Sequence, residues 1–177
     1  MKCFYYLTST LDSTRHIIEN LHKTGINDWF IHVLSRDMPG LKKEHIRASN
    51  YLEQLDLLRP GMIGAIIGFL AGLSVVMLMD SMKPFGPDVP AMVYYAITGA
   101  LTLFGAWEGG LIGIANENKK IAIFHDEIEA GHYLILIYAQ KNLEDKIKSV
   151  LGTQHPEAKF VAVDKNFYNP LTELQRI

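Results

Sequence analysis

The sequence has little cysteine and no excess of one charge. Cys3 is the single cysteine among 177 residues, which excludes an internal disulfide and a cysteine-rich metal site. The 17 Lys and Arg residues nearly balance the 19 Asp and Glu residues, giving a net charge of −2. This balance does not indicate a surface that binds nucleic acid.

Motifs of common catalytic and cofactor sites are also missing. The chain has no nucleophile elbow, no phosphate-binding loop and no Rossmann glycine fingerprint. After Lys2 it enters an aromatic run directly, without the apolar region or small-residue cleavage site of a signal peptide. We therefore expect a protein without enzymatic activity, without a cofactor and without a cleaved signal peptide.

Two long apolar segments occupy the middle of the chain. Residues 62–79 contain no charged residue, and residues 89–115 contain one, Glu108. At a rise of 1.5 Å per residue the first segment is about 27 Å long, close to the thickness of a bilayer's hydrocarbon core. The residues between them, 80–88, are polar and rich in Pro and Gly. The pattern predicts a transmembrane hairpin over residues 61–116.

Each apolar segment carries glycine at every fourth residue. The two sets are Gly64, Gly68 and Gly72 in the first segment and Gly105, Gly109 and Gly113 in the second. Such a set lies on one helix face and allows a second helix to approach closely. Counting depth from Pro60 and Asn116, we predict that Gly64 opposes Gly113 and that Gly72 opposes Gly105. The glycine faces can pack within one chain or between subunits.

Positive residues predict the orientation of the hairpin. Its flanks carry Lys42, Lys43, Arg47, Arg59, Lys119 and Lys120, whereas the turn carries only Lys83. By the positive-inside rule both flanking arms are expected to be cytoplasmic. Tyr94 and Tyr95 near the outer end fit an aromatic belt.

Residues 1–40 have a β-α-β pattern. Residues 3–7 and 29–34 are predicted as strands, and a helix between them is predicted to begin at Asp12 and to end at Gly25. Residues 41–60 then predict a long amphipathic helix that reaches the membrane.

Residues 117–131 predict a matching helix that leaves the membrane and ends at Gly131. Residues 132–177 repeat the β-α-β pattern, with a buried strand over 133–139, a helix capped by Asn142 and closed by Gly152, and a strand over 159–163. Residues 167–177 are predicted to be a peripheral tail. We expect an α+β membrane protein whose ferredoxin-like cytoplasmic domain is interrupted by the hairpin.

The two glycine sets, together with the segment 127–133 that leads into an apolar strand, resemble a family of small bacterial membrane proteins of unknown function. These proteins have a glycine-zipper hairpin, and related domains occur in general stress proteins. The resemblance implies a membrane location and a setting in stress or transport. It implies no catalytic residue.

Glu108 is the one acidic residue within the apolar segments. Counted back from Asn116, it is about 12 Å deep at helical rise. A carboxylate inside a membrane is a candidate ion or proton site, because its insertion costs at least a few kcal/mol. Beside Gly109, it is expected to face protein. The alternative is a structural glutamate that is hydrogen-bonded through Ser74 or Thr102.

Possible metal ligands cluster after the hairpin. His125, Glu129 and His132 are ligand types that zinc accepts, and the first two are separated by one helical turn. The competing interpretation is a solvated helix face followed by the start of a strand.

The sequence leaves three functions open. The favoured one is a membrane protein that forms a homo-oligomer through its glycine-zipper helices and uses its cytoplasmic domain for sensing, binding or assembly. The second is a small channel or transporter that uses Glu108. The third is an accessory subunit of a larger membrane complex.

Overall fold

The computed structural model describes residues 1–86, 88–167, 169, 172 and 174–177. The chain divides into two compact units. The sheet unit consists of Met1–Tyr51 and Lys119–Ile177, and the hairpin unit consists of Leu52–Asn118. The sheet unit is therefore built from both ends of the chain, and the hairpin unit is inserted between them.

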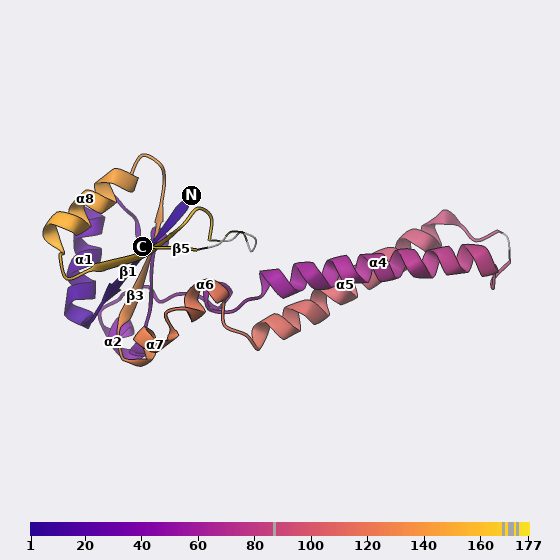
Figure 1. Ribbon diagram of the computed structural model, residues 1–177, viewed down its shortest axis with the longest axis horizontal. Coiled ribbons are helices and arrows are strands. Elements are labelled where there is room, and N and C mark those ends of the chain that lie inside the picture. The colour runs from indigo at the N-terminus through magenta and orange to yellow at the C-terminus, as the bar shows by residue number, and fades with distance from the viewer. Residues whose placement is uncertain (87, 168, 170–171, 173) are drawn as a thin grey trace. The chain divides into compact units, whose positions relative to one another are not determined.

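A five-stranded antiparallel sheet forms the centre of the sheet unit (Figure 1). Its order is β2-β3-β1-β4-β5. The strands are β1 (Lys2–Thr8), β2 (Ile31–Leu34), β3 (Tyr133–Ala139), β4 (Lys159–Asp164) and β5 (Gln175–Arg176). Central strands β1 and β3 come from opposite arms of the chain, with Tyr5 opposite Leu136. Every residue of β3 is buried, which confirms the prediction of a strand covered on both faces.

Two helices cover one face of this sheet, α1 (Leu11–Lys23) and α8 (Glu144–Gln154). Ile17 and Leu21 of α1 pack with Ile147 of α8 in the same buried cluster as the sheet residue Ile135. Burial of each such side chain contributes about 1.5–3 kcal/mol relative to exposure. The spacing of apolar residues in both helices is thus explained by this one core.

The predicted helix ends are partly wrong. Thr10, not Asp12, caps α1: its backbone is extended and its side chain accepts a hydrogen bond from the Ser13 amide at 3.2 Å. Gly25 has φ +91° and follows α1 as predicted.

The predicted ends of α8 are wrong as well. No side chain caps its start at Leu143, and the helix runs past Gly152 to Gln154. His155 ends it, because Pro156 disfavours a helical conformation in the residue before it. The predicted cap, Asn142, and the predicted stop, Gly152, therefore have neither role.

The short helices α6 (Lys119–Ala122) and α7 (His125–Glu129) lie over the opposite face of the sheet. Ile121 and Phe124 are both buried there, and the Phe124 ring stacks on Tyr5 with 5.9 Å between centroids. The prediction of one helix over 117–131 is wrong, because the chain leaves helical geometry at Phe124 to bury both side chains.

The predicted helix over residues 41–60 is also wrong. The chain forms a 3₁₀ turn η1 (Asp28–Phe30) before β2, then α2 (Met38–Lys43), a non-helical segment and a short α3 (Tyr51–Gln54). His45 has φ +55°, a left-handed conformation that interrupts a helix. The Ser49 amide then donates to the Val33 carbonyl at 2.9 Å, so this segment pairs with β2.

The C-terminal segment is part of the sheet unit rather than a peripheral tail. Its residues Gln175 and Arg176 form β5 against β4. The segment is also held by Lys120 of α6, whose buried ammonium nitrogen lies 2.6–3.0 Å from five oxygens and donates its three hydrogens among them. These oxygens belong to the Asp164 carboxylate, the carbonyls of Asn166, Phe167 and Asn169, and the Thr172 hydroxyl.

Two long helices form the hairpin unit, α4 (Leu58–Met82) and α5 (Ala91–Ile114). They have 25 and 24 residues, and both are long and apolar enough to cross a membrane. Lys83, with φ +45°, ends α4, and Pro90 precedes α5. The predicted hairpin of two apolar helices is therefore present.

Candidate functional site

Five of the six periodic glycines face the opposite helix of the same hairpin, and Gly113 faces the residues just before α4. A Cβ atom added at Gly64 would overlap the Gly105 carbonyl oxygen, and one added at Gly105 would overlap the Gly64 carbonyl. Gly68 lies in the same way against Leu101, and Gly109 against Pro60. The helices therefore pack backbone against backbone, and within one chain the glycine faces are occupied.

The register of the two helices differs from the one predicted by counting depth. Gly64 opposes Gly105 instead of Gly113, and Gly72 opposes Thr98 instead of Gly105. Gly113 lies against Asp56 and Leu57, before α4 begins. The shift amounts to about two helical turns, or about 12 Å. The prediction failed because it placed Pro60 and Asn116 at the same level.

This register changes the position of Glu108. Its neighbour Gly109 lies against Pro60 and Gly61, so Glu108 is level with the start of the apolar segment of α4. The side chain is exposed on the hairpin unit, contrary to the expectation that it faces protein. Relative to α4, Glu108 therefore lies beside the end of the apolar segment and not about 12 Å along it.

The hydroxyl groups of the hairpin bond to their own helices. Ser74 donates to the Leu70 carbonyl at 2.9 Å, and Thr102 donates to the Thr98 carbonyl at 2.7 Å. Both therefore satisfy their donors one turn back. The proposed hydrogen bond from either of them to Glu108 is not formed.

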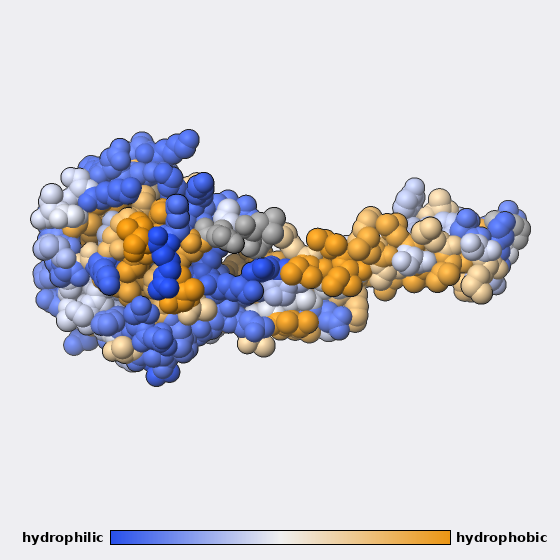
Figure 2. Space-filling model, in the orientation of Figure 1, coloured by the Kyte–Doolittle hydropathy of each residue, from blue (hydrophilic) through white to orange (hydrophobic). Residues whose placement is uncertain are grey.

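Apolar side chains point outward from the hairpin. Within the most apolar 18 residues of each helix, 11 % are buried, and Gly68, Gly72, Gly109 and Gly113 are the buried residues of the two helices. Exposed side chains include Ile66, Ile67, Leu70, Leu103 and Trp107. Figure 2 shows apolar residues over much of the visible face of the hairpin, with hydrophilic residues at its turn.

The three candidate metal ligands do not form a site. Among the described residues, no group of three His, Cys, Asp or Glu side chains is placed to hold a metal ion. Glu129 instead forms an ion pair with Arg36 at 2.6 Å, and His132 lines a cavity of the sheet unit without His125 or Glu129. His125 and Glu129 share α7, as their spacing predicts.

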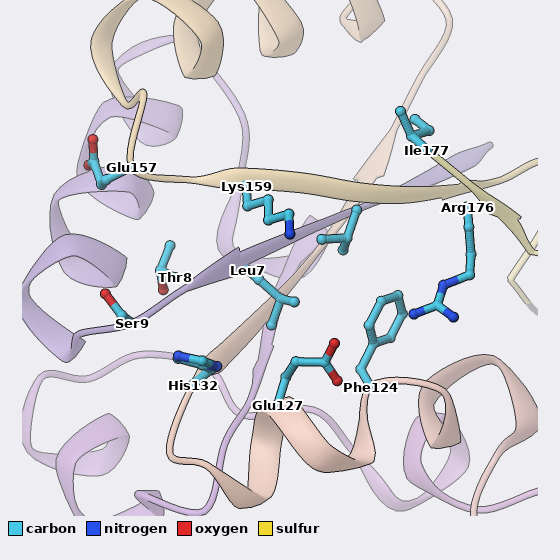
Figure 3. Close-up of a pocket in the computed structure, with 11 residues that line it drawn as sticks. Leu7, Thr8, Ser9, Phe124, Glu127, His132, Glu157, Lys159, Arg176 and Ile177 are labelled. Carbon is cyan, nitrogen blue, oxygen red and sulfur yellow. The ribbon is translucent and has the colours of Figure 1, made fainter.

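That cavity, of about 320 Å³, is a second candidate site (Figure 3). Its apolar wall is formed by Leu7 and Val161 of the sheet and by Phe124 from the loop before α7. Charged side chains complete its lining: Glu127, Glu157, Lys159 and Arg176. The cavity thus combines apolar surface with both signs of charge.

One of its carboxylates is engaged by the helix layer. Glu157 Oε1 lies 2.9 Å from His155 Nδ1 and accepts a hydrogen bond from Ser13 Oγ at 3.0 Å. The hydrogen bond from His155 is the main reason that the pKa of Glu157 is lowered, so this carboxylate is ionised at neutral pH.

The sequence singled out one lining residue of the cavity, His132, but as a possible metal ligand. Lys159 begins an apolar strand, and Arg176 belongs to the expected tail. No local pattern marks either cation. Only the pairing of β5 with β4 brings Arg176 to the cavity.

No protein-family model matches the chain, and no curated protein matches it.

Proposed function

We propose that this chain is a non-enzymatic integral protein of the bacterial inner membrane. The hairpin would be its membrane anchor and the sheet unit a cytoplasmic binding or sensing domain. The main support for this proposal is the arrangement of the hairpin, in which apolar side chains face outward and glycine backbone fills the helix interface. In water such an exposed surface is unfavourable, whereas in lipid tails it is solvated.

The register of α4 and α5 fits a membrane in which the charged residues of both helices lie at the same boundary. Between Arg59 and Asp80, α4 has an uncharged stretch of about 27–30 Å, which matches a hydrocarbon core. Glu108 of α5 is level with Gly61 and therefore lies at the same boundary as Arg59. Trp107, which is exposed beside it, suits the headgroup region.

The sheet supports the placement of both arms on one side. β1 from the first arm pairs with β3 and β4 from the second, so a folded sheet cannot be divided by a bilayer. Arg59 next to α4 favours the cytoplasmic side. Lys120, counted in the sequence argument, is buried with Asp164 and contributes little to this bias.

The strand order supports a ferredoxin-like interpretation of the sheet unit. Strands β1 to β4 form two β-α-β halves in the spatial order β2-β3-β1-β4, and the helices of these halves, α1 and α8, pack on the same face of the sheet. A homo-oligomer remains part of the proposal. It would be assembled through outward residues such as Phe104 and Trp107, because the glycine faces are occupied within one chain.

Spin labels in liposomes test the membrane proposal and the register together. Single cysteines would replace Leu70 at mid-hairpin, Glu108 at the proposed boundary, and Met38 in the sheet unit, all of which are exposed. We expect the label at 70 to be accessible to oxygen but not to a water-soluble nickel complex. The label at 108 should report headgroup depth, and the label at 38 should be fully aqueous.

The unmodified chain is the control, because its one cysteine, Cys3, is fully buried. Equal access of the nickel complex to positions 70 and 38 would contradict the membrane proposal. A label at 108 as deep as the label at 70 would contradict the register and restore the argument for an intramembrane carboxylate.

A further inference from the structure

The cavity of the sheet unit has charges that no described residue neutralises. Among the described part of the chain, Lys159 and Glu127 have no side-chain hydrogen bond or ion pair, although both line the cavity. Lys159 comes from β4 and Glu127 from α7, and Figure 3 shows them entering the cavity from opposite sides. The cavity therefore presents one cation and one anion across its width.

Two other charged side chains of the cavity, Glu157 and Arg176, contact neighbouring residues. Glu157 is held by Ser13 and His155, and the guanidinium of Arg176 lies 5.8 Å from the centroid of the Phe124 ring. The Arg176 side chain therefore shields one side of the apolar wall. Among the described residues, Lys159 and Glu127 are the cation and the anion of the lining that have no such contact.

The apolar wall lies between these two charges. Phe124 is 1 % exposed and Leu7 is 8 % exposed, so both are fixed by the core rather than free to move into the cavity. A volume of about 320 Å³ lies at the small end of ligand pockets and suits a molecule of amino-acid size.

We propose that this cavity binds a small zwitterion with an apolar side group, such as a free aromatic or aliphatic amino acid. Lys159 pairs with the ligand carboxylate, Glu127 pairs with the ligand ammonium group, and the apolar group packs on Phe124, Leu7 and Val161. This inference rests on the proposed binding role of the sheet unit and names its ligand class. It does not depend on the membrane location of the hairpin.

Three related probes separate the contributions of the two charges. Binding of L-phenylalanine, 3-phenylpropionate and phenethylamine to the full chain in detergent micelles would be measured by saturation-transfer NMR and titration. The first carries both charges, the second only the carboxylate and the third only the ammonium group. We expect L-phenylalanine to bind at least about tenfold more tightly than either partner, as one charge-assisted hydrogen bond is lost in each.

Two variants assign each charge. In Lys159→Met, the preference for L-phenylalanine over phenethylamine should disappear, while the preference over 3-phenylpropionate remains. In Glu127→Gln the opposite pattern is expected. Lys141→Met is the matched control, because Lys141 is exposed and lies outside the cavity.

Several results would overturn the proposal: no binding of L-phenylalanine, equal binding of the three probes, or the same loss in Lys141→Met as in Lys159→Met. Circular dichroism of each variant separates a lost site from a lost fold. Failure of this test with a deeply buried spin label at position 70 would reject the ligand class and leave the membrane proposal intact.

Discussion

The sheet unit and the hairpin unit place apolar side chains in opposite ways. In the sheet unit, Ile135, Ile137 and Leu151 point inward and are essentially inaccessible. In the hairpin, Ile66, Ile67 and Leu70 point outward and are more than half exposed. Glycine occupies the interior positions of the hairpin, where the sheet unit has its largest residues.

The membrane location proposed for the hairpin would account for this difference. Water drives large apolar groups together, so the sheet unit is stabilised by the area that it buries. Lipid tails provide no such force, and helices in a membrane associate through close van der Waals contact between small residues. Polar groups show a similar contrast: the Lys120 ammonium group is surrounded by five oxygens of the sheet unit, whereas the hydroxyls of Ser74 and Thr102 donate within their own helices.

The largest expected effect comes from removing the charge inside the sheet unit. Lys120→Met leaves Asp164, which is fully buried, without its cation and removes the anchor of the C-terminal segment. Breaking a buried pair from one side costs about 3–5 kcal/mol. Trp29 and Trp107 are the two tryptophans, one in each unit. In a Trp107→Phe background, urea unfolding followed by Trp29 fluorescence therefore measures the sheet unit alone.

Arg36→Ala is the matched control for this prediction. The Arg36–Glu129 pair has the same 2.6 Å separation but is largely exposed. Its loss is expected to cost about 0–1 kcal/mol. Equal destabilisation by the two variants would show that burial does not set the strength of these pairs.

We expect the hairpin to be destabilised by a bulky side chain added at the helix interface rather than by removal of a charge. In Gly68→Leu the new side chain meets the Leu101 backbone and the Thr102 Cα atom, which would lie 3.1 Å from its Cβ. Overpacking costs about 1–3 kcal/mol, and more where backbone must move. In a Trp29→Phe background, Trp107 fluorescence during titration from mild detergent into SDS measures unfolding of the hairpin.

Gly99→Leu is the matched control for Gly68→Leu. A Cβ at Gly99 meets nothing within 4 Å, so this variant has the same gain in helix propensity without the clash. We expect it to be at least as stable as the unmodified hairpin. Destabilisation of the same size in both variants would place Gly68 outside the helix interface.

Features set by local pattern could be predicted from the sequence. Apolar spacing predicts α1 and α8, and continuous apolar runs predict β3 and the two hairpin helices. Gly25 and Gly131 adopt positive φ as expected at helix ends. The predicted helices over 41–60 and 117–131 failed because tertiary contacts overrode propensity. Pairing of Ser49 with Val33 interrupts the first, and burial of Phe124 interrupts the second.

Features that depend on register or on distant segments could not be predicted. The depth of Glu108 depends on which residue of α4 lies opposite, and glycine spacing fits several registers equally well. The cavity requires β4, β5 and the loop before α7, which are separated in the chain and share no motif. Lys159 and Arg176 could therefore be assigned to it only from the folded chain.

The smallest expected effect concerns a charge at the edge of the helix layer. The pKa of Glu157 is lowered in the folded chain, chiefly by the hydrogen bond from His155. Its contribution to stability is therefore fully present above the unfolded glutamate pKa and is lost as the pH falls through the lower folded value. In the Trp107→Phe background, Glu157→Gln should change the urea midpoint followed by Trp29 fluorescence only slightly at neutral pH, and this difference should vanish on acidification. Because the carboxylate is about half exposed, the difference should be well below that of Lys120→Met. A difference that grows on acidification would show that the ionised carboxylate does not stabilise the sheet unit.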